Sequence, residues 1–248
     1  KDVRNKMSTV YADTLEPTVP TKDTTLGATG DSITIGANSI NTNVIQDSGG
    51  NVLFQSDGSG TLSNVNSAFS ADLKLLSTQT ASDSASISFT SGIDSTYDVY
   101  IFKYFDINPA TDATDFTFQG STDGGSGYGV NMTTTFFHSM HTEADDYDNL
   151  SYVGGDDLAN STSYQNIGRS WSNNADAGGV GEFYLFAPSS TTYVKHFLIT
   201  ANGENVDLGP ASEEIFIAGY FNTTSAINAI NFKCGSGNFD GVIKMYGL

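Results

Sequence analysis

From Ser84 onward, the chain is a succession of short apolar segments separated by turn residues. Apolar and polar residues alternate in "TDFTFQGS" (114–121), while Tyr, Val, Ile and Phe dominate the longer "TYDVYIFKYFDI" (96–107). Such patterns are typical of strands, and the intervening Gly, Asn, Asp and Ser are typical of turns. The segments expected to form strands are 84–89, 96–107, 114–121, 130–138, 163–171, 180–187, 193–202, 213–221, 226–234 and 239–247.

Roughly ten strands at short spacing predict an all-β protein. Its C-terminal part, residues 86–248, is expected to form an antiparallel β-sandwich head of jelly-roll type. Phe102 and Phe216 are expected on interior strands of this head. Helix signals are scarce: "AFSADLKLLS" (68–77) is the best helix candidate, and it fits a strand equally well.

Residues 27–85 are more polar and are expected to form a short stalk and connector. "GDSITI" (30–35) and "GNVLFQ" (50–55) each place a Gly-Asx corner before a brief strand. Two such units are too small to offset the entropy of ordering them. Winding three copies of the chain together would bury the stalk residues between subunits: Ile33, Ile35, Val44, Ile45, Leu53 and Phe54. We therefore expect a homotrimeric stalk, with a flexible linker as the alternative.

Residues 1–26 carry a basic cluster and then Pro17 and Pro20. Proline keeps the backbone extended and removes a hydrogen-bond donor, which suits a tether lying in a groove of a partner. The rest of the chain is acidic, so Lys1, Arg4 and Lys6 are the expected contacts of this anchor segment to an acidic partner surface.

The chain has 28 acidic and 10 basic residues, for a formal net charge of -18. Nucleic-acid binding needs clustered Lys and Arg, so no nucleic-acid partner is expected. Anionic membrane surfaces are disfavoured as well. No apolar run reaches the roughly 18 residues needed to span a bilayer, so no membrane insertion is expected. The acidic loops are expected to serve solubility, with a Ca²⁺ site in them as the alternative.

Catalytic patterns are weak. His138 and His141 lie three apart where a strand is expected to run into a loop, and a strand would turn them to opposite faces, so no metal site is expected. His196 is expected in the core or at an interface, and the single cysteine, Cys234, is expected to be buried. No G-x-S-x-G segment is present. A glycosidase needs two carboxylates that face each other across a cleft, and neighbours in the sequence do not by themselves show this. The adjacent pairs in this chain are Asp145/Asp146, Asp156/Asp157 and Glu213/Glu214. A non-enzymatic protein without cofactor is expected.

The stretch between Phe136 and Trp171 has the weakest strand signal after residue 86. It combines aromatic residues with Asp and Asn, and such loops suit glycan recognition because rings stack on sugars while polar groups bond hydroxyls. The alternative is an ordinary loop with Trp171 in the core. The receptor-binding residues expected here are Tyr147, Tyr152, Tyr164 and Trp171.

"GDSITIGA" resembles the short Gly-Asp strand units of bacteriophage tail-fibre stalks. From about Ser86 the chain is similar to C-terminal domains of virion structural proteins of marine phages. The segments that carry this similarity are "FTFQGSTDGGSGYG", "TTTFFHSMHTE", "FYLFAPSSTTYVKHF" and "IFIAGYFNTTSAINAINFKCGSGNFDGVIKMYGL".

The resemblance implies a virion component at the particle surface and brings no catalytic residues. A tail fibre that attaches the phage to the host cell surface is the expected function. Its expected partners are two further copies of the chain, other virion proteins of the tail or capsid, and a host-surface glycan. The alternatives are a capsid-surface decoration fibre and a polysaccharide-degrading tailspike.

Overall fold

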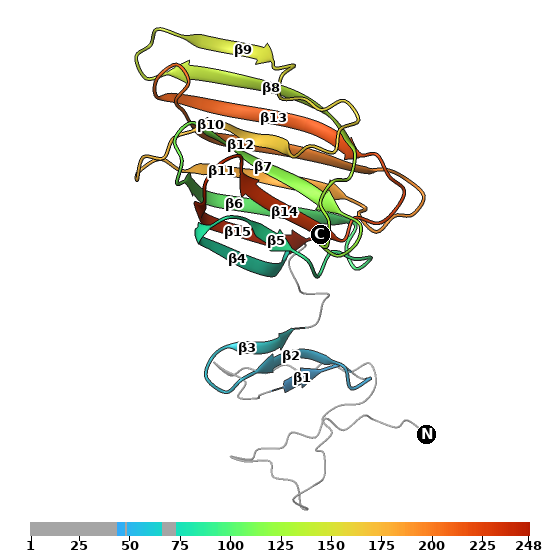
Figure 1. The fold of residues 1–248 in the computed structure, drawn as a ribbon. Helices are drawn as coiled ribbons and strands as arrows, with labels where there is room; N and C mark the ends of the chain where they lie inside the picture. Colours follow the sequence, from blue (N-terminus) through green and yellow to red (C-terminus); the bar gives the residue numbers. More distant parts are fainter. Residues whose placement is uncertain (1–43, 48, 66–72) are drawn as a thin grey trace, which may run out of the picture. The chain divides into compact units, whose positions relative to one another are not determined.

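The computed structural model describes residues 44–47, 49–65 and 73–248, and the regular elements among them are all strands. The chain divides into two compact units, Lys1–Asn66 and Ser67–Leu248. All strand pairs are antiparallel, so the expected all-β class is confirmed (Figure 1).

The described part of the first unit is one sheet in the order β1-β2-β3, with β1 Val44–Gln46, β2 Val52–Ser56 and β3 Leu62–Val65. Its turns are closed by carboxylates. The Asp47 side chain accepts hydrogen bonds from the backbone N–H groups of Gly49 and Asn51, at 2.8 and 2.9 Å, and Asp57 closes the second turn in the same way. The pKa of Asp47 is lowered first by a hydrogen bond from the Asn51 side chain and then by one from the Asn51 backbone.

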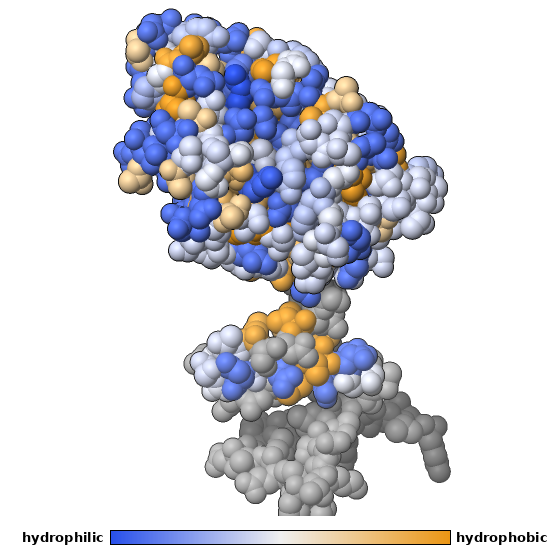
Figure 2. Space-filling model, viewed as in Figure 1, coloured by the Kyte–Doolittle hydropathy of each residue, from blue (hydrophilic) through white to orange (hydrophobic). Residues whose placement is uncertain are grey.

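Apolar residues of the first unit are poorly covered within one chain. Val44 and Ile45 are 39% and 43% exposed, and Leu53 and Phe54 are half-buried. Figure 2 shows hydrophobic residues over much of the described surface of this unit. The other residues expected to serve the stalk and the anchor lie outside the described residues: Ile33, Ile35, Lys1, Arg4 and Lys6.

The second unit contains the remaining described strands, and every segment expected to form a strand overlaps one of them. They are β4 Lys74–Ser84, β5 Ile87–Phe89, β6 Val99–Pro109, β7 Thr114–Ser121, β8 Met132–Thr142, β9 Asp148–Tyr152, β10 Gln165–Trp171, β11 Gly179–Phe186, β12 Lys195–Asn205, β13 Ala211–Phe221, β14 Ala229–Cys234 and β15 Phe239–Gly247.

These strands form a sandwich-like fold, as expected. One layer has the order β4-β15-β6-β11-β12-β13-β8-β9 and the other the order β5-β14-β7-β10 (Figure 1). β10 joins the first layer through a single pair with β12, Trp171 opposite Asn205. The long layer extends past the short one, so that β8 and β9 lie beyond the main area of overlap.

Aromatic side chains fill the space between the layers. Phe183 of the long layer lies 4.6 Å from Phe118 of the short layer and stacks on Phe102 at 5.4 Å, measured between ring centroids. Phe102, Phe118 and Phe183 are all fully buried, and Cys234 is buried as expected. Packed aromatic pairs contribute beyond their buried area, so this cluster adds to the stability of the head.

The boundary of the head differs from the expected one at residue 86. β4 pairs with β15 over most of its length, from Lys74 opposite Gly247 to Ser84 opposite Phe239. Its Ser- and Thr-rich sequence resembles a connector, yet the backbone ladder and the burial of Ala81 tie it to the sandwich. The described part of the helix candidate 68–77 is strand. We use "head" below for the unit Ser67–Leu248.

The expected burial of Phe216 is wrong. On β13, Ile215 and Ile217 face the core, so the alternation of the strand turns Phe216 to the outer face of the sheet. There it stacks on Phe137 of β8 at 4.9 Å between ring centroids, and Phe137 is 41% exposed.

We expect Phe102→Ala to lower the free energy of unfolding by about 3–5 kcal/mol, because it opens a cavity among packed rings. Phe216→Ala should cost only about 1 kcal/mol, since it removes one cross-strand pair at the surface. Urea denaturation of both variants checks this. Equal losses would contradict the assignment of the two faces.

A chain starting at Ser67 should fold as the intact head, because it keeps the β4–β15 ladder. A chain starting at Ser86 should be markedly less stable and prone to self-association, because it exposes an unpaired β15 edge. Thermal unfolding and size-exclusion chromatography of the two truncations test this. A stable monomer from the shorter chain would show that β4 is dispensable.

Candidate functional site

A cavity of about 310 Å³ lies at the β8–β9 end of the long layer, and we call it the β9 cavity. Its walls come from β8, β9, β10 and the loop that follows β12. The lining residues are His138, Met140, Tyr147, Asn149, Ser151, Tyr152, Val153, Arg169, Asp207 and Leu208.

Strand register explains why polar residues meet here. His138 of β8 lies opposite Ser151 of β9, and Met140 lies opposite Asn149, so all four share the inner face of this edge. The neighbouring strand β13 places Glu213 in phase with its buried isoleucines and opposite Met140. Because successive side chains of a strand alternate between faces, one ladder delivers the set to the same side.

Glu213 is the fully buried carboxylate behind the cavity. One oxygen, Oε1, makes a very short contact with His138 Nδ1 and lies 3.5 Å from Arg169 Nη1. The other, Oε2, accepts a hydrogen bond of 2.8 Å from Asn205 Nδ2. A charge removed from water needs such partners, so the carboxylate is held in one orientation.

Arg169 of β10 links this buried carboxylate to the cavity wall. Its Nε lies 3.0 Å from an Asp156 carboxylate oxygen, and its Nη2 lies 3.5 Å from Asp207. Its side chain is only 25% exposed. The guanidinium therefore joins strand β10 to two loops and leaves a positive group in the wall of the cavity.

Aromatic and apolar side chains form the rim. Tyr147 is 38% exposed, Tyr152 is 56% exposed and Leu208 is 57% exposed. The Tyr152 hydroxyl donates a very short hydrogen bond to Asp157, which raises the pKa of Tyr152. This bond fixes the phenol end and leaves part of the ring available to a ligand.

The four residues expected to bind a receptor separate into two groups. Tyr147 and Tyr152 line the same cavity, whereas Tyr164 and Trp171 do not. Tyr164 donates a hydrogen bond of 3.0 Å to Asn231. Lys233 Nζ lies over the Tyr164 ring in a cation–π contact, 4.1 Å from the ring centroid.

A surface role for Trp171 is wrong, because its side chain is 1% exposed and stacks on Phe116 in the core. A Cβ atom at Gly168, Gly179 or Gly203 would lie 2.5, 2.1 or 2.3 Å from atoms of the indole. Three glycines on three strands therefore make room for the ring, and such a gap cannot be read from the local pattern around the tryptophan.

The histidines are placed differently from their expected settings. His138 and His141 do face opposite sides, but both belong to strand β8 and not to a loop. His141 is exposed and lies 3.1 Å from Asp145. His196, expected in the core or at an interface, is not in the core: it is exposed on the outer face of β12, 5.7 Å from the Tyr220 ring.

The residues missed as site candidates are Asn149, Ser151, Arg169, Asn205, Asp207 and Leu208. Glu213 was grouped with Glu214, but β13 turns the two to opposite faces, Glu213 buried and Glu214 exposed. One signal was present: "EEIFI" places Glu213 on the same alternation as Ile215 and Ile217, which marks a buried carboxylate.

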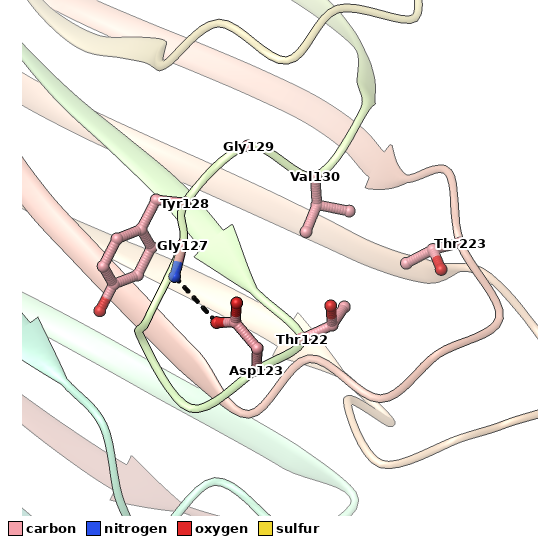
Figure 3. A pocket seen from close by; sticks show the side chains of 7 residues that line it. All are labelled: Thr122, Asp123, Gly127, Tyr128, Gly129, Val130 and Thr223. Carbon is pink, nitrogen blue, oxygen red and sulfur yellow. Dashed lines mark hydrogen bonds between the residues drawn. The ribbon is translucent and has the colours of Figure 1, made fainter.

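Two other pockets contain fewer polar side chains that could bind a ligand. In Figure 3 the Asp123 carboxylate turns back to accept a hydrogen bond of 2.9 Å from the Gly127 backbone of its own loop. The pKa of Asp123 is lowered mainly by a hydrogen bond from the Ser121 side chain. This carboxylate therefore stabilises the turn of its own loop. A groove of about 420 Å³ on the outer face is mainly apolar and includes His196 and Tyr220.

Among residues 44–47, 49–65 and 73–248, no group of three or more His, Cys, Asp or Glu side chains is arranged to hold a metal ion. The same residues include no helix long and apolar enough to cross a membrane. Comparison with protein-family models, with curated proteins and with solved structures gives no match.

Proposed function

We propose that the protein is a virion fibre whose head binds a glycan of the host cell surface in the β9 cavity. The observation that carries the proposal is the composition of this cavity: two partly exposed tyrosine rings at the rim and a wall of hydrogen-bonding groups below them. Aromatic faces cover the apolar faces of sugar rings, while amide, carboxylate and guanidinium groups pair with hydroxyls.

The polar groups are held before a ligand arrives. Arg169 and Asp207 face each other across 3.5 Å, and Asn149 donates a hydrogen bond of 2.9 Å to Ser151. A preorganised wall reduces the ordering cost of binding.

We expect Tyr147→Ala and Tyr152→Ala each to weaken binding to purified host-envelope polysaccharide by about tenfold, the loss of one stacking contact. Tyr193→Ala is the matched control, because Tyr193 is 74% exposed and lies outside the cavity lining. Isothermal titration calorimetry measures the affinities. Unchanged binding in both cavity variants would reject the site.

The proposed fibre is a homotrimer assembled through the first unit. Val44, Ile45 and Leu62 are 39%, 43% and 57% exposed within one chain, and exposed apolar side chains that gather in a patch are typical of an interaction surface. Burial between three copies would remove this surface from water. The N-terminal segment with Lys1, Arg4 and Lys6 is proposed to anchor the fibre to an acidic surface of the tail.

Light scattering of the full chain should give three times the chain mass of 26.3 kDa. Ile45→Asp should shift the protein to monomers, because it would bury charges at the proposed contact. Ser139→Asp is the control, since it adds the same charge at an exposed position of the head, outside the first unit. A wild-type monomer at micromolar concentration would remove the trimer from the proposal.

A further inference from the structure

Two side chains that line the β9 cavity and the buried carboxylate behind it form a series from the opening to the interior. Ser151 Oγ lies 3.2 Å from His138 Nε2, and His138 Nδ1 contacts the buried Glu213 carboxylate on its other side. We propose that Ser151, His138 and Glu213 form a hydrolytic triad that cleaves acyl esters. The absence of a G-x-S-x-G segment does not oppose this, because triads are recognised by geometry and occur on unrelated folds.

The hydrogen-bond partners of His138 determine which of its two ring nitrogens carries the proton. The Glu213 carboxylate only accepts hydrogen bonds, so His138 carries its proton on Nδ1 and leaves the Nε2 lone pair facing Ser151. Ser151 is half-buried at the cavity, whereas the His138 side chain is 5% exposed and the Glu213 side chain is 0% exposed. The nucleophile is therefore the member that a substrate reaches first.

Glu213 acts as a positioning residue. Asn205 donates a hydrogen bond to Oε2, the oxygen away from the histidine, and Arg169 lies 3.5 Å from Oε1, the oxygen that also contacts His138. The carboxylate in turn fixes the plane and the tautomer of the imidazole. This is the orienting role that the third member of a triad plays.

A donor for the developing oxyanion is also present. Asn149 Nδ2 lies 2.9 Å from Ser151 Oγ, on the same face of β9 and two residues away. When Ser151 attacks an ester carbonyl, this amide, which donates to Oγ in the structure, would turn to the neighbouring carbonyl oxygen. A side-chain amide in this position stabilises the negative charge of a tetrahedral intermediate.

The reaction balances with water as the only co-reactant. Ser151 Oγ attacks the ester carbonyl carbon and its proton passes to His138 Nε2. The carbon–oxygen bond to the alcohol breaks, and the alcohol leaves with the proton from His138, which gives an acyl-Ser151 ester. Water then attacks this ester, its proton passes to His138 and then to Ser151 Oγ, and a carboxylic acid is released.

The substrate class rests on the proposed glycan binding. With a sugar ring against Tyr147 and Tyr152, a small O-acyl group on that sugar would enter the cavity toward Ser151. The cavity volume of about 310 Å³ leaves room for a small acyl group beside Ser151. The activity would therefore remove O-acyl groups, such as acetyl, from the bound glycan.

The first test measures release of p-nitrophenol from p-nitrophenyl acetate by the full-length protein. Ser151→Ala should lower kcat/KM at least about 100-fold. Ser139→Ala, on the exposed outer face of the same β8–β9 ladder, should leave it unchanged. Glu213→Gln should lower kcat about 100- to 10,000-fold with little change in KM, because it disturbs the histidine tautomer. Wild-type hydrolysis no faster than that of Ser151→Ala overturns the proposal.

The second test does not depend on a variant of the buried carboxylate. A fluorophosphonate probe should modify the wild-type protein and Ser139→Ala at Ser151, located by peptide mass spectrometry, and should leave Ser151→Ala unmodified. Labelling absent from Ser151 overturns the triad. Glycan binding without ester hydrolysis would reject the triad and keep the proposed glycan-binding function. Ester hydrolysis without glycan binding would keep the triad and reject the proposed glycan-binding function.

Discussion

The junction between the two layers at Trp171 and Asn205 is the constraint on which the candidate site depends. This pair is the only register contact between β10 and β12. On the core side, the indole fills a space left by three glycines. On the other side, Asn205 donates hydrogen bonds to the Arg169 carbonyl at 3.0 Å and to Glu213 at 2.8 Å. Core packing and the orientation of the buried carboxylate are thus set at one place.

Burial of Glu213 has an energetic consequence. Removing one partner of a buried charge typically costs about 3–5 kcal/mol, although replacing the whole set by apolar residues often costs nothing. The cluster of Glu213, His138, Arg169 and Asn205 is therefore not explained by stability alone. A set of charged and polar groups kept at the wall of a cavity is what a binding or catalytic site requires.

The acidic composition of the chain also bears on the site. With 28 acidic residues against 10 basic ones, most of the surface repels anions. Arg169 is held within 3.5 Å of Asp156, Asp207 and Glu213, so its charge is largely compensated. A neutral sugar therefore fits this field better than an anionic one.

The sequence by itself determined the class of the fold and most of the strands. Strand segments are local: alternation and β-branched or aromatic residues stand between turn residues, as in β7, whose bounds coincide with the expected segment 114–121. The burial of Cys234 and the opposite faces of His138 and His141 followed from the same local rule. Two of the four residues expected to bind a receptor, Tyr147 and Tyr152, line the β9 cavity, and their role there stays a prediction.

Only the tertiary structure decided the rest, because it depends on which distant strands become neighbours. β4 joined the head through a ladder with β15 at the other end of the chain, which no local pattern shows. Trp171 became a core residue because glycines of β10, β11 and β12 surround it. Ser151, His138 and Glu213 come from three strands, and the register of those strands alone brings them into line.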